Sequence, residues 1–171
     1  YNYYQDEQFK GINLELVLMA CQRAGIQCEF VLLPWKRAMK MAQTTVNSGL
    51  VSTSRTMDRE SMYQWVGPLV SGKTCFYKLR IRADIVVTDR ASLRNYTVAL
   101  EVDDVYKELL DSWGFEENIH YIVFPKKQGD IAPFAKGKLD LIIGSAITIG
   151  AYLKGSDITV HDIEPVFSVH D

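Results

Sequence analysis

The segment STSRTMDR carries the strongest chemical signal in the chain, because it concentrates hydrogen-bond donors directly after a short segment, Val46 to Val51, that resembles the end of an apolar strand. Ser52, Thr53 and Ser54 offer hydroxyl groups, and two arginines, Arg55 and Arg59, follow within the next turn or so. Such donors, together with backbone N–H groups, bind a carboxylate or phosphate by converging on the anion. In the alternative interpretation, the two serines cap a turn and both arginines lie in solvent.

Acidic side chains are the other candidates for chemistry. Asp103 and Asp104 open a predicted helix, where an acid caps free N–H groups and suits the helix dipole. A ligand contact by one of the pair is the alternative. Together with Glu101 they would be the candidates for a general acid, if the protein were an enzyme. No nucleophile with a partnered base is apparent, so we expect no catalytic residue and no cofactor.

Histidine and cysteine patterns indicate no metal site. No carboxylate or cysteine stands at ligand spacing from any of the three histidines, His120, His161 and His170. The cysteines Cys21, Cys28 and Cys75 match no zinc or CxxC pattern, and we expect small core side chains. A bridge between Cys21 and Cys28 stays open in an oxidising compartment, although the odd count favours thiols.

Composition bounds the function classes. The chain has 171 residues, of which 47% are hydrophobic and 23% charged, as in a packed globular protein. Its formal net charge is -2 and is spread over both halves, so we expect no nucleic-acid partner. The first residues, YNYYQDEQ, are too polar for a signal peptide. We therefore expect a soluble chain, or one from which a signal peptide has been removed.

The first half of the chain alternates helices with apolar strands. Apolar spacing predicts a helix over 12–24, which Gly25 would stop, and a strand over 27–33. Pro34 opens a second predicted helix at Trp35, and a short strand over 46–51 leads into the donor-rich segment. These elements place that segment at a strand exit.

The second half repeats this order. We predict a strand at 96–102, a helix at 103–113, a strand at 120–125, a short helix at 130–137 and a buried strand at 139–144. Two copies of such a unit predict an α/β protein with two lobes, each a mainly parallel sheet flanked by helices, and a ligand cleft between the strand ends. The lobes would be 1–78 and 79–171, with a returning hinge strand at about 163–171.

Three motifs resemble the family 3 extracellular solute-binding proteins, the polar-amino-acid receptors of bacterial ABC transport. They are G-x-x-x-E-L at Gly11 to Leu16, P-W-x-R-A at Pro34 to Ala38, and the serine-rich strand exit ending in T-x-x-R at Thr56 to Arg59. The resemblance covers essentially the whole chain. It implies the type II periplasmic binding fold and a periplasmic location after removal of a signal peptide.

The resemblance also implies site roles. Arg59 would grip the ligand carboxylate, and Ser52 with Ser54 would supply further donors. Trp35 or Tyr1 would pack on the body of the ligand. We therefore expect a small polar or anionic ligand bound without catalysis, and possible contact with an ABC permease.

Two alternatives share the scaffold. One is the ligand-sensing module of a signalling protein, and the other is an enzyme such as a dehydratase or peptidoglycan lyase. Family members usually begin with another strand and continue into closing helices, so the first lobe looks incomplete here, either as a fragment or as a natural short form. An unpaired sheet edge would favour self-association.

Two positions depart from the amino-acid receptors. Ser145 stands where the resemblance leads us to expect the aspartate that neutralises the ligand ammonium. Asp103 and Asp104 stand where a small hydroxyl turn is expected. Because a buried ammonium without an ion pair loses its hydration, we expect standard α-amino acids to bind weakly. A ligand with one anionic end and a neutral polar end would be preferred.

Overall fold

The computed structural model describes residues 2–5 and 7–169, and the chain forms two compact units, Tyr1–Ser71 and Gly72–Asp171. The division falls seven residues before the boundary expected after residue 78, so the whole strand β3 (Thr74–Leu79) belongs to unit 2. Among the described residues, no helix is long and apolar enough to cross a membrane.

Unit 1 contains a hairpin and two helices. Strands β1 (Tyr3–Gln5) and β2 (Gln8–Lys10) pair antiparallel, and they precede α1 (Ile12–Ala24) and α2 (Trp35–Thr44). A 3-10 helix, η1 (Met57–Met62), begins within the donor-rich segment and contains Arg59. Both predicted helices are confirmed.

Helix α1 ends before Gly25, as predicted. Gly25 adopts the left-handed conformation, with φ of 68°, at the end of α1. Its N–H donates to the carbonyl of Gln22, and the next N–H donates to the carbonyl of Cys21. A left-handed residue at this position satisfies the last carbonyls of a helix, and glycine adopts it without steric cost.

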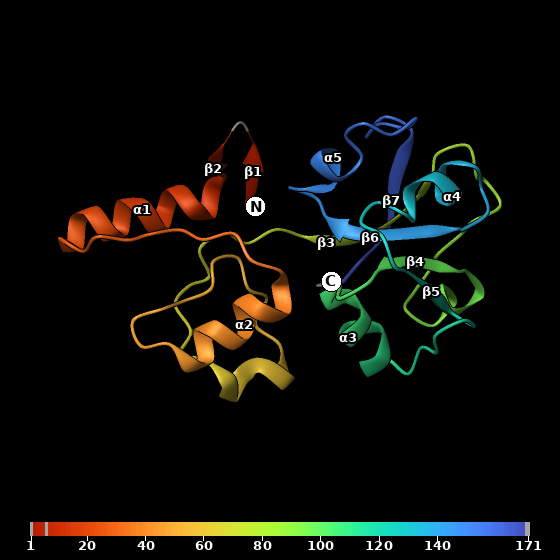
Figure 1. The fold of residues 1–171 in the computed structure, drawn as a ribbon. Coiled ribbons are helices and arrows are strands. Elements are labelled where there is room, and N and C mark those ends of the chain that lie inside the picture. Colours follow the sequence, from red (N-terminus) through yellow and green to blue (C-terminus); the bar gives the residue numbers. More distant parts are fainter. Residues whose placement is uncertain (1, 6, 170–171) are drawn as a thin grey trace. The chain divides into compact units, whose positions relative to one another are not determined.

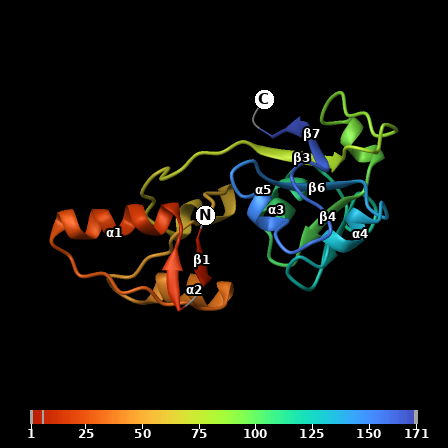
Figure 2. The ribbon, with the colours of Figure 1, turned by 90° about the horizontal axis from the view of Figure 1, so that it is seen from above.

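The two strands predicted in unit 1 do not form. Residues 27–33 and 46–51 lie outside every strand, and the β1–β2 hairpin is the only sheet among the described residues of this unit. Both segments contain apolar residues, but a strand exists only through hydrogen bonds to a neighbouring strand. Figure 2 shows the connection from α1 to α2 as an extended trace. Val31 is 57% exposed and Leu32 is 65% exposed, so these apolar side chains are not packed in a core.

A disulfide joins the end of α1 to this extended connection. Cys21 and Cys28 are bonded, with their Cα atoms 6.3 Å apart, whereas Cys75 is a buried free thiol. The expectation of thiols was therefore wrong for the first two cysteines. The sequence separation of 7 residues was compatible with either state.

Removing this bridge should destabilise unit 1. For so short a loop, the chain-entropy model gives about 2 to 3 kcal/mol for the C21S/C28S double variant. Denaturant unfolding followed by tryptophan fluorescence would measure the loss, with dithiothreitol added to the native protein as a matched control. Equal unfolding midpoints for the native and double-variant proteins would contradict a stabilising role.

Unit 2 is built on a five-stranded mixed sheet in the order β5-β4-β6-β3-β7 (Figure 1). Strands β4, β5 and β6 are parallel, whereas β3 pairs antiparallel with β6 and β7. The remaining elements are β4 (Val98–Glu101), β5 (Tyr121–Phe124), β6 (Leu141–Ser145), β7 (Ile163–Ser168), η2 (Ser92–Asn95), α3 (Val105–Ser112), α4 (Ile131–Ala135) and α5 (Ile149–Tyr152). Every strand and helix predicted here forms, and η2 and α5 are additional.

Alternating residues fill a core on each face of the sheet. On one face, Tyr77 and Ile142 pack with Phe134 of α4 and Ile149 of α5. On the other face, the buried side chains include Phe76, Val98, Ile143 and Leu110, the last from α3. The sheet is therefore covered on both sides, which explains the near-continuous apolar strands.

Candidate functional site

Unit 1 brings the donor-rich segment into contact with the first turn of α1. The amide nitrogen Nδ2 of Asn13 donates to Ser52 Oγ at 2.7 Å. Asn13 is only 6% exposed, and Ser52 adopts a left-handed conformation with φ of 63°. The helix starts after Gly11 with no side-chain cap. Its first N–H groups and the positive end of its dipole therefore favour an anion nearby.

Arg59 and Arg55 lie in different environments. Arg59 is 8% exposed, and its backbone N–H donates to the carbonyl of Thr56 at 3.1 Å. Arg55 is exposed and forms a two-bond ion pair with Glu60, at 2.7 and 2.5 Å, while its guanidinium lies 5.7 Å from the centre of the Trp65 ring. Of the two arginines, Arg55 is therefore the solvent-facing one.

Three buried polar atoms, one in α1 and two in the donor-rich segment, have no hydrogen-bond partner among the described residues. They are Asn13 Oδ1, Thr53 Oγ1 and Thr56 Oγ1. Each such group costs about 1 to 3 kcal/mol of stability, so a cluster of them needs a physical reason. Binding a polar ligand is one such reason. We refer to Asn13, Ser52, Thr53, Thr56 and Arg59 as the unit 1 polar cluster.

The sequence identified only part of this cluster. Ser52, Thr53 and Arg59 were predicted, but Asn13 and Thr56 were missed as candidate site residues. The contact between Asn13 and Ser52 spans 39 positions of sequence, which no local pattern can reveal. The available signal for Asn13 was weak, because an asparagine in a first helical turn is often a surface residue.

The remaining predicted residues of unit 1 are more exposed. Ser54 lies in solvent, and Trp35, the first residue of α2, is partly exposed. Since α2 has no buried residue, Trp35 is not the core tryptophan that its helical spacing allowed. Tyr1 lies outside the described residues.

In unit 2, polar residues follow the carboxyl ends of the parallel strands. Ser145 ends β6 and is buried, and its Oγ accepts from the N–H of Ile147 at 3.3 Å. After β4, Asp103 adopts a left-handed conformation and is exposed. Asp104 caps α3 by accepting from the N–H of Tyr106 at 3.0 Å, which confirms the predicted capping role.

A buried carboxylate, Asp130, and a partly exposed one, Glu101, share a tyrosine hydroxyl in unit 2. The hydroxyl of Tyr152 contacts both oxygens of Asp130, at 2.6 and 2.7 Å, and Glu101 Oε1 at 3.2 Å. Glu101 also accepts from the N–H of Gln128, and Asp130 is only 2% exposed. Burial, followed by the Asp130 contact, raises the pKa of Tyr152, which keeps its proton as a donor. Sequence reasoning named Glu101 but missed Asp130 and Tyr152.

Asp104 is electrostatically perturbed by this environment. Burial is the main cause that raises the pKa of its carboxyl to about 6, and the charges of Glu101 and Asp130 add to the effect. The folded state therefore binds this proton more tightly than the unfolded chain. The stability that the folded protein gains from protonating Asp104 is fully present below about pH 4, and it is lost as the pH rises through about 6.

Replacing Asp104 with asparagine should relieve this loss. Asparagine keeps the helix cap, so we expect D104N to raise the free energy of unfolding by about 1 to 2 kcal/mol at pH 8. At pH 4 the effect should vanish. Thermal unfolding at both pH values would measure the change, with exposed Asp103→Asn as the control. A stabilisation that is equal at the two pH values would contradict the titration.

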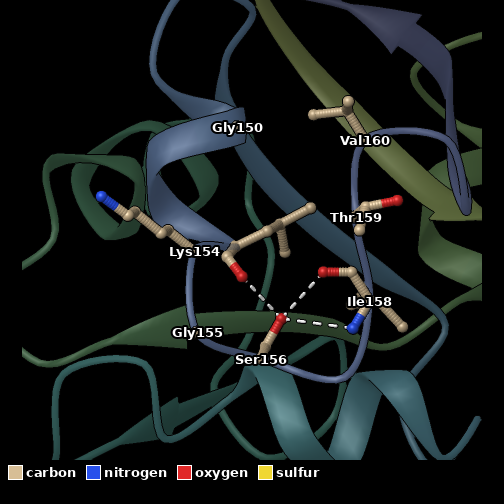
Figure 3. Close-up of a pocket in the computed structure, with 8 residues that line it drawn as sticks. Gly150, Lys154, Gly155, Ser156, Ile158, Thr159 and Val160 are labelled. Atoms are coloured by element: carbon tan, nitrogen blue, oxygen red, sulfur yellow. Dashed lines mark hydrogen bonds between the residues drawn. The ribbon is translucent and has the colours of Figure 1, made fainter.

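The hollow formed by residues 150–160 is not a convincing binding site (Figure 3). Ser156 Oγ lies within hydrogen-bond distance of the carbonyls of Leu153, at 2.7 Å, and Ile158, at 3.0 Å, and its single proton serves one of them; it also accepts from the Ile158 N–H at 3.4 Å. Its central polar group thus stabilises the loop itself.

The described residues contain no group of side chains suited to a metal ion. His120 accepts a backbone hydrogen bond from Glu116, and His170 lies outside the described residues.

Solved structures show what fold this is. The arginine-, lysine-, histidine-binding protein ArtJ from Geobacillus stearothermophilus matches with a TM-score of 0.74 and 17% identity, over 98% of this chain and 70% of that one. An ancestral arginine-binding protein bound to glutamine matches at 0.69 and 10%, over 97% and 72%.

A third match is the periplasmic VFT2 domain of BvgS from Bordetella pertussis, with a TM-score of 0.73 and 15% identity over 99% of this chain and 71% of that one. No protein-family model and no curated protein matches the sequence. The chain therefore has the type II periplasmic binding fold, as the sequence motifs implied.

Proposed function

We propose that the protein is a periplasmic solute-binding protein that captures a small polar or anionic solute for ABC transport, without catalysis. The main support is the unit 1 polar cluster, which contains a buried arginine and three buried hydroxyl or amide oxygens without a partner among the described residues. Such donors suit an anion, because a guanidinium and neutral donors together replace its hydration. Fold alone would not justify the proposal, since one fold serves many functions.

The disulfide supports the proposed location. Disulfides persist in oxidising compartments such as the bacterial periplasm and are rare in the cytosol. The bond between Cys21 and Cys28 therefore fits a periplasmic protein. An ABC permease is the partner that this role implies. Self-association through the unpaired segments 27–33 and 46–51 belongs to the same proposal.

The sensing alternative keeps the same ligand site. It is favoured by the likeness to the BvgS periplasmic domain. The TM-score of that match is 0.73, which is close to the values of 0.74 for ArtJ and 0.69 for the ancestral arginine-binding protein. The enzyme alternative would use Asp104, whose raised pKa of about 6 suits a group that gains and loses a proton in mildly acidic solution. If the native protein converts a bound ligand and the D104N variant does not, the enzyme alternative is favoured.

A thermal-shift screen against organic acids, amino acids and sugars tests the proposal. A ligand that binds only the folded state at 100 times its Kd stabilises that state by about 2.7 kcal/mol, which is a readily visible shift. We expect small carboxylates to raise the melting temperature and neutral sugars to leave it unchanged. If no small polar or anionic compound shifts the transition, the proposal is wrong.

Trp35 should contribute to ligand binding rather than to stability. It is partly exposed on a helix with no buried residue, and an aromatic contact is worth about 0.5 to 1.5 kcal/mol. We therefore expect Trp35→Ala to weaken binding of a screen hit about tenfold with a nearly unchanged melting temperature. The control is Trp65→Ala, which removes another partly exposed tryptophan of unit 1. Strong destabilisation by Trp35→Ala, with affinity retained, would assign Trp35 to the core.

A further inference from the structure

Asn13 has an unusual position in the unit 1 polar cluster. It is 94% buried, its Nδ2 is engaged with Ser52 Oγ at 2.7 Å, and its Oδ1 has no hydrogen-bond partner among the described residues. The contact with Ser52 fixes the orientation of the amide plane. Asn13 therefore carries a buried acceptor without a partner among the described residues, beside the donor-rich segment that begins at Ser52.

The rest of the cluster lies close by along the chain. Thr53 follows Ser52 directly, and both Thr53 Oγ1 and Thr56 Oγ1 are likewise buried without a partner. Thr56 is joined to Arg59 by a backbone hydrogen bond of 3.1 Å. An anion held by Arg59 and the threonine hydroxyls would use donors only. The Asn13 oxygen then requires a donor on the ligand itself.

We infer that Asn13 is a specificity-determining residue that selects a carboxylate carrying a neighbouring hydroxyl group, as in the 2-hydroxy acids. The ligand hydroxyl donates to Asn13 Oδ1 while the carboxylate takes the donors of the cluster. A hydroxyl suits this oxygen better than an ammonium does, because a neutral amide leaves a buried positive charge unpaired. This inference rests on the proposed function and names the class of ligand for the same site.

Matched pairs of acids provide the test. Lactate would be compared with propionate, and malate with succinate, by calorimetric titration of the native protein. Each pair differs by the one hydroxyl group. We expect at least one hydroxy acid to bind about tenfold or more tightly than its partner, because without that hydroxyl the buried acceptor stays unpaired.

Variants of Asn13 separate recognition from a structural role. Asn13→Ala should abolish the preference within each pair, because the acceptor is gone. Asn13→Asp keeps a hydrogen bond to Ser52, whose hydroxyl can donate to the carboxylate, but should weaken all four acids by about 100-fold through like-charge repulsion. Gln22→Glu adds the same charge at an exposed position of the same helix and should change nothing.

Each outcome has a defined meaning. Equal affinities within both pairs would overturn the inference and leave the proposed function standing. A preference that persists in Asn13→Ala would assign Asn13 a merely structural role and would also overturn the inference. If the native protein binds none of the four acids, the inference is wrong, and the wider screen of amino acids, other anions and sugars then decides the proposed function separately.

Discussion

Replacing Arg59 with alanine should cost about 2 to 5 kcal/mol of ligand binding, because the anion would be left desolvated and without its charged partner. Arg59 is the buried arginine of the unit 1 polar cluster, at 8% exposure. Calorimetric titration of a carboxylate found in the screen would measure the loss. Circular dichroism would confirm that the variant is folded.

Arg55 provides the matched control for this prediction. It lies four residues earlier, is exposed, and is already paired with Glu60. Exposed pairs of this kind contribute little, so Arg55→Ala should change the affinity by less than about 1 kcal/mol. Equal small losses in the two variants would mean that neither arginine is the anchor.

Standard α-amino acids should bind more weakly, by several kcal/mol, than analogues that lack the ammonium group. The side chain at the expected position of the ammonium partner is Ser145, which is buried and accepts a local hydrogen bond from Ile147. A serine hydroxyl cannot neutralise a buried positive charge. The arginine and glutamine named for the similar receptors are therefore not expected to be good ligands here.

Glutamine and glutaramate make the direct comparison, because they differ by the ammonium group alone. We expect titration to show glutaramate as the tighter ligand by 100-fold or more. Micromolar or tighter binding of glutamine would contradict the prediction. In that case, loss of glutamine binding in D103N or D104N would show that one of these acids supplies the counter-charge.

Local signals predicted the helices and the elements of unit 2. Pro34 and Gly25 act within their own turns, so α1 and α2 appear where the sequence placed them. The strands of unit 2 also formed because their partners are present in the chain. The strands expected over 27–33 and 46–51 do not form, because apolar patterning does not specify the neighbouring strand to which a strand must hydrogen-bond.

The site was predictable only where its residues are sequence neighbours. Ser52, Thr53 and Arg59 stand in one short segment, and their donor chemistry is visible without a structure. Asn13 joins them through a contact across 39 positions, and Tyr152 reaches Asp130 across 22. Such contacts between distant residues depend on the tertiary fold, so they cannot be predicted from the residue types and their local spacing.

The most direct test of a solute-binding role anchored in unit 1 is a crystal structure with a bound carboxylate from the screen. We predict that the carboxylate accepts hydrogen bonds from the Arg59 guanidinium, at about 2.7 to 2.9 Å, and from hydroxyls of the unit 1 polar cluster. A ligand bound elsewhere, with Arg59 making no contact to it, would contradict the account.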